Sequence, residues 1–416
     1  MEQTGTLIGW MEISGYLGVD KTTAQRWEKQ HGLPVRHAGG LRGRVEAERT
    51  DLDRWRREAG MDAHTAQPGR RLAPGLLVTV LGLVLGSGGM GALLGWRLRA
   101  PAPAAWRVTE RELIVSDASG RERWRRRFHA DLLPGRGWLG DLDGDGTVEM
   151  LFAYHPTTRA ETGAPLICFS ERGEEKWRFA PGRKVADDLR EWSPIFFANN
   201  FRVLTVEGRR RIVVTSNHSN GYPDQVAVLD ENGKMLGEYF HSGHLLSMDH
   251  ADVDGDGIEE VLLAGVNNGE GRATLVILDP RRVSGASTQP PGHPTQLRGF
   301  GPGAEKAVVL FPRSCVTEKQ HYPFNYAGEV SAGARLITVQ VSEWLNGHGP
   351  RLWYRLDPNL SVTRVTASGE VQDLHRLLQR LKLVDHEPFL EDELEQLRRS
   401  VEVRWKQPRR SSARGE

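Results

Sequence analysis

The chain has 416 residues, a length typical of two or three domains. Its 55 lysines and arginines almost balance its 54 aspartates and glutamates, and the net charge of +1 excludes a protein that binds nucleic acid through bulk charge. Two cysteines exclude a disulfide-stapled scaffold and a four-cysteine zinc site, while an apolar content of 38% excludes a wholly disordered chain.

The first predicted element is a small domain over residues 8–58. An apolar helical face ends near Gly18, and a capped second helix is expected over residues 21–30. Glycines and arginines over residues 36–44 predict a basic hairpin, which a third helix follows. With the string YLGVDKTTAQRWEKQHGLPV as its most specific part, this segment resembles the winged helix-turn-helix domains of the MerR and phage excisionase type.

The resemblance implies DNA binding. In such domains the second helix enters the major groove, and the hairpin, or wing, lies on the phosphate backbone or in the minor groove. The residues that this places at DNA are Lys21, Thr22, Thr23, Gln25, Arg26, Arg36, Arg42 and Arg44. The alternative is a small helical domain that binds a protein instead of DNA.

A linker and a membrane span are predicted next. Residues 59–71 contain Gly and Pro without apolar periodicity and predict a flexible linker. Residues 72–97 predict one transmembrane helix, because 25 consecutive residues from Leu72 to Trp96 carry no charge and arginines flank both ends. The alternative is a buried core helix, in whose interior the glycines of this segment would be costly.

The predicted span also carries two expectations about assembly and topology. GxxxG spacings at Gly82–Gly86 and Gly91–Gly95 favour a homodimer through close helix contact. Because DNA binding requires the cytoplasm, we expect a single-pass inner-membrane protein whose N-terminus is cytoplasmic and whose C-terminal domain is extracytoplasmic.

Two acidic loops, GDLDGDGTVEM from Gly140 and ADVDGDGIEEV from Ala251, predict cation sites. Carboxylates at loop positions 1, 3, 5 and 9 repel one another unless a hard cation with oxygen ligands neutralises them. The predicted ligands, which include the carbonyl oxygen of position 7, are Asp141, Asp143, Asp145, Thr147 and Glu149, and Asp252, Asp254, Asp256, Ile258 and Glu260.

The type of loop follows from what comes after it. An EF-hand needs a glutamate at position 12, where Phe152 and Leu263 stand, and strand-like apolar runs follow in place of a helix. The loops therefore resemble the FG-GAP or VCBS repeats of integrin-like β-propellers, and this resemblance implies Ca²⁺ as the cofactor. The alternative is a pair of solvated acidic turns.

A second repeat supports this architecture. Glycine turns followed by alternating residues recur at Gly120, Gly173 and Gly233, with a fainter copy at Gly369. Residues 105–370 are therefore predicted to form a propeller-like β domain of about four or five blades, whose exact number and closure stay open. Apolar spacing predicts a helical segment over 371–406, and residues 407–416 are expected to be a disordered tail.

Two further questions stay open at this point. His241, His244 and His250 precede the second loop and suit either metal binding or ordinary hydrogen bonding. Cys168 and Cys315 could pair if this half of the chain is exported. No Ser/His/Asp motif, nucleotide-binding glycine loop or zinc motif is found, so we expect no enzyme.

Together these patterns predict a multi-domain fold: a small α domain with a β wing, one transmembrane helix, a mainly β propeller-like domain and a short helical C-terminus. The predicted function is a membrane-anchored one-component transcription regulator, with a cytoplasmic DNA-binding head and an exported calcium-binding sensor for an unknown extracytoplasmic ligand. One alternative is a surface-anchored, calcium-dependent adhesion protein whose N-terminal domain binds a cytoplasmic protein. Another is a degenerate propeller lyase or hydrolase that uses the acidic loops.

Overall fold

The computed structural model divides the chain into two compact units, residues 1–97 and 98–416. It describes residues 6–8, 10–17, 28, 33–38, 44–58, 101–129, 132–156, 163–319, 322–333, 335–343, 349–384 and 391–406.

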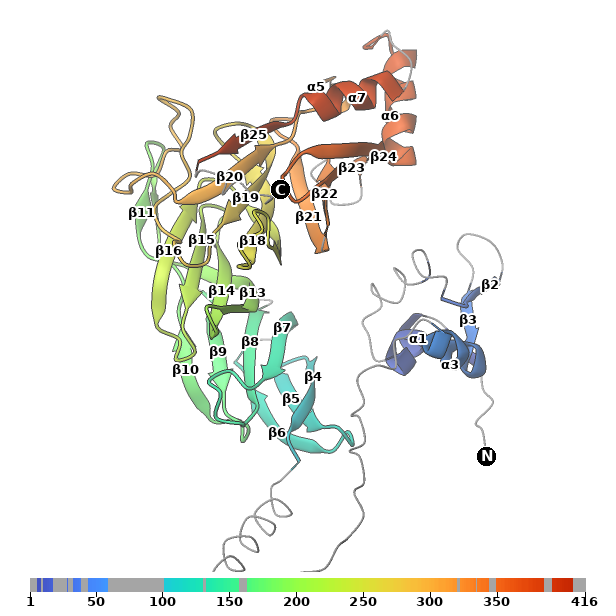
Figure 1. Cartoon of the computed structure of the whole chain (residues 1–416), viewed down its shortest axis with the longest axis vertical. Coiled ribbons are helices and arrows are strands. Elements are labelled where there is room, and N and C mark those ends of the chain that lie inside the picture. Colours follow the sequence, from blue (N-terminus) through green and yellow to red (C-terminus); the bar gives the residue numbers. More distant parts are fainter. Residues whose placement is uncertain are drawn as a thin grey trace, which may run out of the picture. The chain divides into compact units, whose positions relative to one another are not determined.

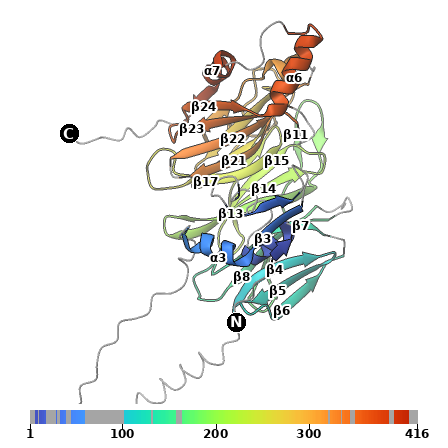
Figure 2. The same cartoon turned by 90° about the vertical axis from the view of Figure 1, so that its right-hand side faces the viewer.

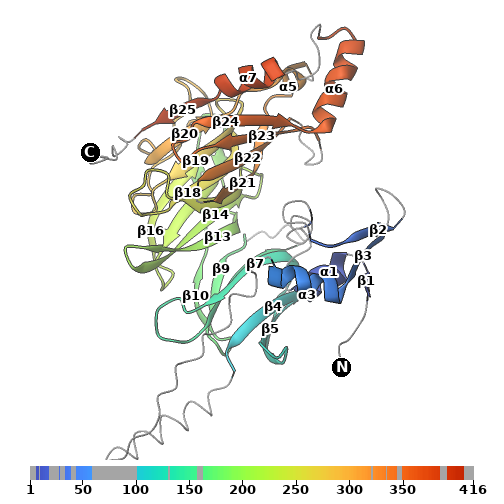
Figure 3. The same cartoon turned by 45° about the vertical axis from the view of Figure 1, so that its right-hand side comes forward.

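The described part of the N-terminal unit contains a three-stranded antiparallel sheet and two helices (Figure 3; Figure 2 labels β3 and α3 of this unit). Its elements are β1 (Thr6–Ile8), α1 (Trp10–Leu17), β2 (Arg36–Ala38), β3 (Arg44–Glu48) and α3 (Arg49–Glu58). Alternation along β3 buries Val45 and Ala47 on one face of the sheet. The rest of its small core is Leu7, Ile13, Leu33 and Leu52.

This architecture corrects the predicted small helical domain with a peripheral wing. β1 pairs with β3, so that Thr6 lies opposite Glu48, and β3 is the central strand of a sheet. The expected wing is therefore part of a mixed α/β unit. The predicted second helix over residues 21–30 lies outside the described residues, Glu28 apart.

The predicted membrane span is also corrected. Among the described residues, no helix is both long enough and apolar enough to cross a bilayer. The segment 72–97 and the linker 59–71 lie outside the described residues, as do the two GxxxG spacings. The single-pass inner-membrane localisation therefore has no support in the structure.

The described part of the second unit contains five antiparallel sheets of three to five strands, which follow one another in chain order, and one separate two-stranded pair (Figure 1, Figure 3). The first sheet contains β4 (Pro103–Thr109), β5 (Glu112–Asp117) and β6 (Glu122–Arg127). The second contains β7 (Leu132–Gly140), β8 (Glu149–Pro156), β9 (Leu166–Phe169) and β10 (Glu175–Phe179). The third contains β13 (Phe196–Val206), β14 (Arg209–His218), β15 (Asp224–Leu229) and β16 (Met235–His241), preceded by the short pair β11 (Val185–Ala186) and β12 (Glu191–Trp192).

The last two sheets carry the helices of this unit. The fourth sheet contains β17 (Leu245–Ala251), β18 (Glu260–Asn267), β19 (Arg272–Leu278) and β20 (Glu305–Leu310), to which the C-terminal strand β25 (Glu402–Trp405) is added. The fifth contains β21 (Tyr326–Gly333), β22 (Leu336–Ser342), β23 (Arg351–Leu356) and β24 (Val362–Ala367). The helices are α5 (Cys315–Lys319), α6 (Gly369–Arg380) and α7 (Glu391–Arg399).

Each of the main cores of this unit lies between successive sheets. In β14, Ile212 and Val214 belong to the core shared with the second sheet, whereas Val213 belongs to the core shared with the fourth. This alternation follows from the two-residue period of a strand. Because both faces of this strand are covered, five consecutive residues, 212–216, are buried. The sheets therefore stack face to face, as blades do.

A glycine turn followed four residues later by a tryptophan explains the repeat seen in the sequence. Gly120 precedes Trp124 in the first sheet, and Gly173 precedes Trp177 in the second. Each tryptophan packs on the turn glycine of the next sheet. A Cβ on Gly173 would lie 2.7 Å from the Trp124 ring, and one on Gly233 would lie 2.6 Å from the Trp177 ring. The recurring glycines thus mark contacts between sheets.

These contacts give a testable prediction. Gly233→Ala is expected to lower the free energy of unfolding by about 2–4 kcal/mol, because the new methyl group meets Trp177 and the backbone has φ +77°. Gly120→Ala is the matched control: its φ is +80°, but no atom lies within 4 Å of the added Cβ, so only about 1–2 kcal/mol should be lost. Urea unfolding measures both, and equal losses would contradict the packing role.

The C-terminal region differs from the predicted helical segment 371–406. Gly369 begins helix α6 and is not a fourth hairpin turn. After α7 the chain returns as strand β25, which pairs with β20 from Leu310↔Glu402 to Ala307↔Trp405. This pairing places apolar Val403 against the core between the fourth and fifth sheets. The helical spacing of the leucines could not indicate such a contact. The unit is mostly β. The predicted multi-domain fold class is wrong in its helical N-terminal domain, its transmembrane helix and its wholly helical C-terminal segment.

Candidate functional site

The two acidic loops occupy equivalent places in two sheets. The first connects β7 to β8 in the second sheet, and the other connects β17 to β18 in the fourth. In both cases the loop joins the first two strands of a sheet, and the glutamate at position 9 begins the second strand.

In the first loop, the aspartate at position 1 organises the turn. The Asp141 carboxylate accepts hydrogen bonds from the N–H groups of Gly144 (2.7 Å) and Gly146 (3.0 Å). Both glycines are left-handed, with φ +82° and +81°, which explains their presence at these positions. At position 9, Glu149 is buried and accepts a hydrogen bond from the Leu142 N–H.

A lysine from the last strand of the sheet joins this first loop. Lys176 Nζ lies 2.8 Å from Asp143 Oδ2 and 3.0 Å from Glu149 Oε1, at positions 3 and 9. Burial alone would lower the pKa of Lys176, but the hydrogen bonds with these two carboxylates outweigh it and raise that pKa. The Lys176 side chain is 32% exposed, so its ammonium group is within reach of solvent.

The second loop repeats the same turn. The Asp252 carboxylate accepts hydrogen bonds from the N–H groups of Gly255 (2.7 Å) and Gly257 (2.9 Å). Glu260 is fully buried and accepts one from the Val253 N–H. The backbone arrangement of position 1, the two glycines and position 9 is therefore built twice.

A lysine also contacts the carboxylates of the second loop, but here the lysine side chain is buried. Lys306 Nζ lies 2.6 Å from Asp254 Oδ2 and 2.5 Å from Glu260 Oε1, and the Lys306 side chain is 5% exposed. Burial raises the pKa of the Glu260 carboxyl, and Lys306 acts against this shift. The second carboxylate oxygen of Asp254 is buried and has no hydrogen-bond partner among the described residues.

The structure brings together three of the four predicted carboxylates in each loop. Oxygen atoms of Asp141, Asp143 and Glu149, and likewise of Asp252, Asp254 and Glu260, lie within 4.8 Å of one another.

The aspartate at position 5 of each loop has its partners outside the group of three converging carboxylates. Asp145 Oδ1 accepts hydrogen bonds from the backbone and side chain of Thr147, and Asp256 pairs with Arg281 at 2.9 Å. Burial by itself raises the pKa of Asp256, but the Ile258 N–H and the Arg281 guanidinium outweigh it and lower that pKa.

The two loops differ in charge. Lys176 leaves the four carboxylates of the first loop with an excess of three negative charges. In the second loop, Lys306 and Arg281 together reduce this excess to two, although Arg281 is shared with Asp279. Clustered carboxylate oxygens are the ligands that Ca²⁺ prefers, so both donor sets fit this cation. The first loop fits it better, because its lysine is accessible and its residual charge is larger.

The spacing of the loop residues did not predict that these two lysines contact the loops. Both lie on strands that pair elsewhere in their sheets, Lys176 on β10 and Lys306 on β20, at 27 and 46 residues from the glutamates they contact. For Lys306 the available signal was a lysine near the start of a mostly apolar strand, since Ala307, Val308 and Val309 follow it, whereas β10, with the sequence EKWRF, offers no such signal for Lys176.

The histidines before the second loop have separate partners. His241 Nε2 donates to the Val266 carbonyl at 3.0 Å, and His244 pairs with the buried Asp224 at 3.1 Å. His250 lies 3.6 Å from Glu259. The described structure therefore does not unite them around a metal. Cys168 and Cys315 are both free thiols.

A cavity of about 480 Å³ opens between the third and fourth sheets. Its polar wall includes the buried Tyr239, whose hydroxyl donates to Glu305 Oε1 at 3.1 Å, and the exposed Lys406, whose ammonium lies 3.0 Å from Glu305 Oε2. These groups therefore form one internal polar network in the wall of the cavity.

Arg36 is the one residue predicted to contact DNA whose side chain the structure describes. Arg36 lies opposite Glu46, and the Thr6 hydroxyl donates to Glu48 at 2.6 Å. The carboxylate residue Glu46 therefore lies opposite Arg36, which weakens the attraction of this arginine to a DNA phosphate. The side chain of Arg44 and all of Lys21, Thr22, Thr23, Gln25, Arg26 and Arg42 lie outside the described residues.

No protein-family model and no curated protein matches the chain. Similar solved structures include BBS1N in complex with ARL6DN, at 10% identity over 64% of this chain and 77% of that chain, with a TM-score of 0.30. BamB from Moraxella catarrhalis is 11% identical over 62% of this chain and 71% of its own, with a TM-score of 0.28. At these TM-scores the likeness carries no argument about fold or function.

The predicted transcription regulator is therefore wrong. The described part of the chain is mostly β, contains no membrane-spanning helix, and has a mixed α/β N-terminal unit in place of a helical DNA-binding domain. The predictions of DNA and a membrane as partners are therefore wrong. The predicted homodimer depended on the membrane span, and the predicted extracytoplasmic ligand depended on export, so both lose their basis. The surface-anchored adhesion protein is set aside for the same reason.

Proposed function

We propose that residues 103–405 form a calcium-binding β-repeat domain, similar to FG-GAP or VCBS repeats, that acts by binding and not by catalysis. The observation that carries the proposal is the duplicated turn. Three carboxylates converge at loop positions 1, 3 and 9 in two different sheets, on the same glycine-dependent backbone.

In the first loop, Asp141, Asp143 and Glu149 would hold the cation. A bound Ca²⁺ supplies positive charge to clustered carboxylates and ties the loop to the start of the following strand. The chain prepares this loop: the glycine N–H groups orient Asp141, and the Leu142 N–H orients Glu149. Lys176 balances part of the charge and, being partly exposed, can turn into solvent.

In the second loop, Asp252, Asp254 and Glu260 would hold the cation, and the unpaired oxygen of Asp254 favours it. Buried Lys306 opposes it, because the lysine bridges two of the three ligands and has little access to solvent. Two sites of unequal affinity are therefore expected, with the first loop the tighter.

Calcium titration of the chelator-treated full chain by isothermal calorimetry tests this proposal. Asp143→Asn is expected to weaken the tighter site at least tenfold, about 1.4 kcal/mol, because it removes a charged ligand. Asp254→Asn should affect only the weaker site. Asp230→Asn is a control, since Asp230 shapes the turn between β15 and β16 and belongs to neither group of converging carboxylates. Absence of calcium binding at millimolar concentration, or equal binding by all variants, would overturn the proposal.

A further inference from the structure

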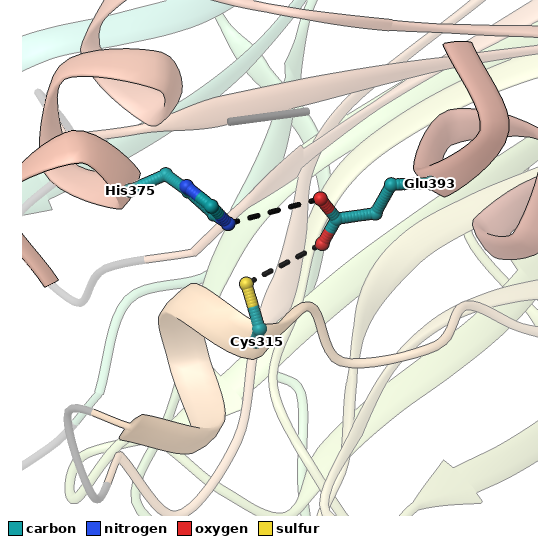
Figure 4. A group of neighbouring side chains, drawn as sticks. All are labelled: Cys315, His375 and Glu393. Atoms are coloured by element: carbon teal, nitrogen blue, oxygen red, sulfur yellow. Dashed lines mark hydrogen bonds and ion pairs between the residues drawn. The ribbon is translucent and has the colours of Figure 1, made fainter. Parts of the chain in front are cut away.

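A mixed group of metal-ligating side chains lies at the C-terminal end of the second unit, outside both acidic loops. It consists of Cys315 from α5, His375 from α6 and Glu393 from α7 (Figure 4). The three side chains point toward one another from three separate helices. The thiol and the imidazole both face the carboxylate.

The distances suit one small cation. Cys315 Sγ lies 3.4 Å from Glu393 Oε1, and His375 Nε2 lies 3.8 Å from Glu393 Oε2. One ligand atom from each of the three residues lies within 4.8 Å of the others. For a tetrahedral zinc ion with metal–sulfur and metal–nitrogen bonds of the usual length, neighbouring ligand atoms are about 3.4–3.6 Å apart. Only small side-chain movements separate the observed group from that geometry.

The surroundings hold the ligands in place and leave a path to solvent. His375 is fully buried, while Glu393 keeps 17% of its side chain exposed and Cys315 is half-buried. The residue before Cys315 is fixed by a buried carboxylate: the Ser314 hydroxyl donates to Glu343 Oε2 at 2.6 Å. Such supporting hydrogen bonds commonly orient the ligands of metal sites.

We propose that Cys315, His375 and Glu393 form a zinc site that fastens α5, α6 and α7 together. Sulfur, imidazole and carboxylate donors in one group favour Zn²⁺ over the hard cations expected at the acidic loops. Three protein ligands leave a fourth position for water.

The same three groups suit a nucleophilic cysteine less well. A catalytic thiol needs a neighbouring positive charge that stabilises the thiolate. Cys315 instead faces the carboxylate of Glu393, whose Oε1 lies 3.4 Å from the Cys315 sulfur. A metal ion would supply the positive charge that this group lacks.

The site has a structural role in the fold. α5 has five residues and α7 nine, lengths at which isolated helices are marginal in water. α7 leads directly into β25, which completes the fourth sheet. A zinc ion bridging the three helices would therefore stabilise the attachment of the C-terminal strand.

Metal binding by the full chain tests the proposal. After chelator treatment, one equivalent of Zn²⁺ is expected to bind, measured by competition with a chromophoric chelator. Cys315→Ser and Glu393→Gln, which preserve side-chain shape, should each weaken that binding at least tenfold. Cys168→Ala is the matched control, because Cys168 is a buried thiol in another core, and it should bind zinc as the unmodified chain does. Asp143→Asn should also leave zinc binding unchanged, which separates this site from the calcium loops.

Cobalt(II) substitution supplies a readout that does not depend on the stability of the variants. The unmodified chain loaded with Co²⁺ should show a thiolate-to-metal charge-transfer band, and Cys315→Ser should abolish it. Substoichiometric binding, a Co²⁺ spectrum without the thiolate band, or the same zinc affinity in Cys315→Ser and Cys168→Ala would overturn the proposal.

Discussion

Replacing Lys306 by methionine is expected to lower the free energy of unfolding by about 3–5 kcal/mol in calcium-free buffer. The Lys306 ammonium is 5% exposed and bridges Asp254 and Glu260, whose side chains are 6% and 0% exposed. Methionine fills similar volume but leaves two buried carboxylates without their counter-charge. Removal of one partner from a buried ion pair is costly for this reason. Chemical unfolding in the presence of a chelator measures the loss.

Calcium should reverse much of that loss. In Lys306→Met the second loop keeps its carboxylates and loses the lysine that competes for them, so its calcium affinity should rise and bound calcium should restore stability. Lys176→Met is the matched comparison in the first loop. Lys176 and Asp143 are 32% and 26% exposed, so solvent screens that pair, and the contact with the buried Glu149 is weakened by the exposure of Lys176. A loss of only about 1–2 kcal/mol is therefore expected. Equal losses in the two variants, or no rescue of Lys306→Met by calcium, would contradict the role given to Lys306.

The acidic loops show which part of a site a sequence can reveal. Alternating carboxylates and the glycines between them form the turn locally, so their spacing alone predicted where Asp141 and Asp252 would lie. Lys176 and Lys306 enter the same loops only because β10 and β20 belong to the same sheets as those loops. Local spacing carries no information on such a contact.

The N-terminal unit shows the opposite case. Helix ends, caps and a basic hairpin are local features, and they favoured a helical DNA-binding domain. The decisive contact is between Thr6 and Glu48, 42 residues apart, which makes β3 a central strand. Similarly, Cys315, His375 and Glu393 have no common spacing, and only the packing of three helices brings them together.

His241 gives the second large prediction, a loss of stability in acid. Its imidazole is fully buried, its Nε2 donates to the Val266 carbonyl, and its Nδ1 lies 3.3 Å from the Tyr239 hydroxyl. Burial lowers the pKa of His241 from 6.5 to about 4. Between these two values the unfolded chain binds a proton that the folded chain does not, so stability falls as the pH falls. At pH 4 the loss through this residue should reach about 3 kcal/mol relative to pH 7.

Urea unfolding at a series of pH values between 7 and 4 measures this effect. His241→Gln keeps an N–H donor for the Val266 carbonyl but does not titrate. Between pH 7 and pH 4 this variant should therefore lose about 3 kcal/mol less stability than the unmodified protein loses. Carboxylates that titrate in acid, such as Asp279, are unchanged in the variant, and therefore the difference between the two proteins reports His241 alone. His129→Gln, at an exposed histidine, should follow the unmodified chain. If His241→Gln lost stability as steeply as the unmodified protein, the buried imidazole would not be the group that titrates, because no other titrating side chain differs between the two proteins.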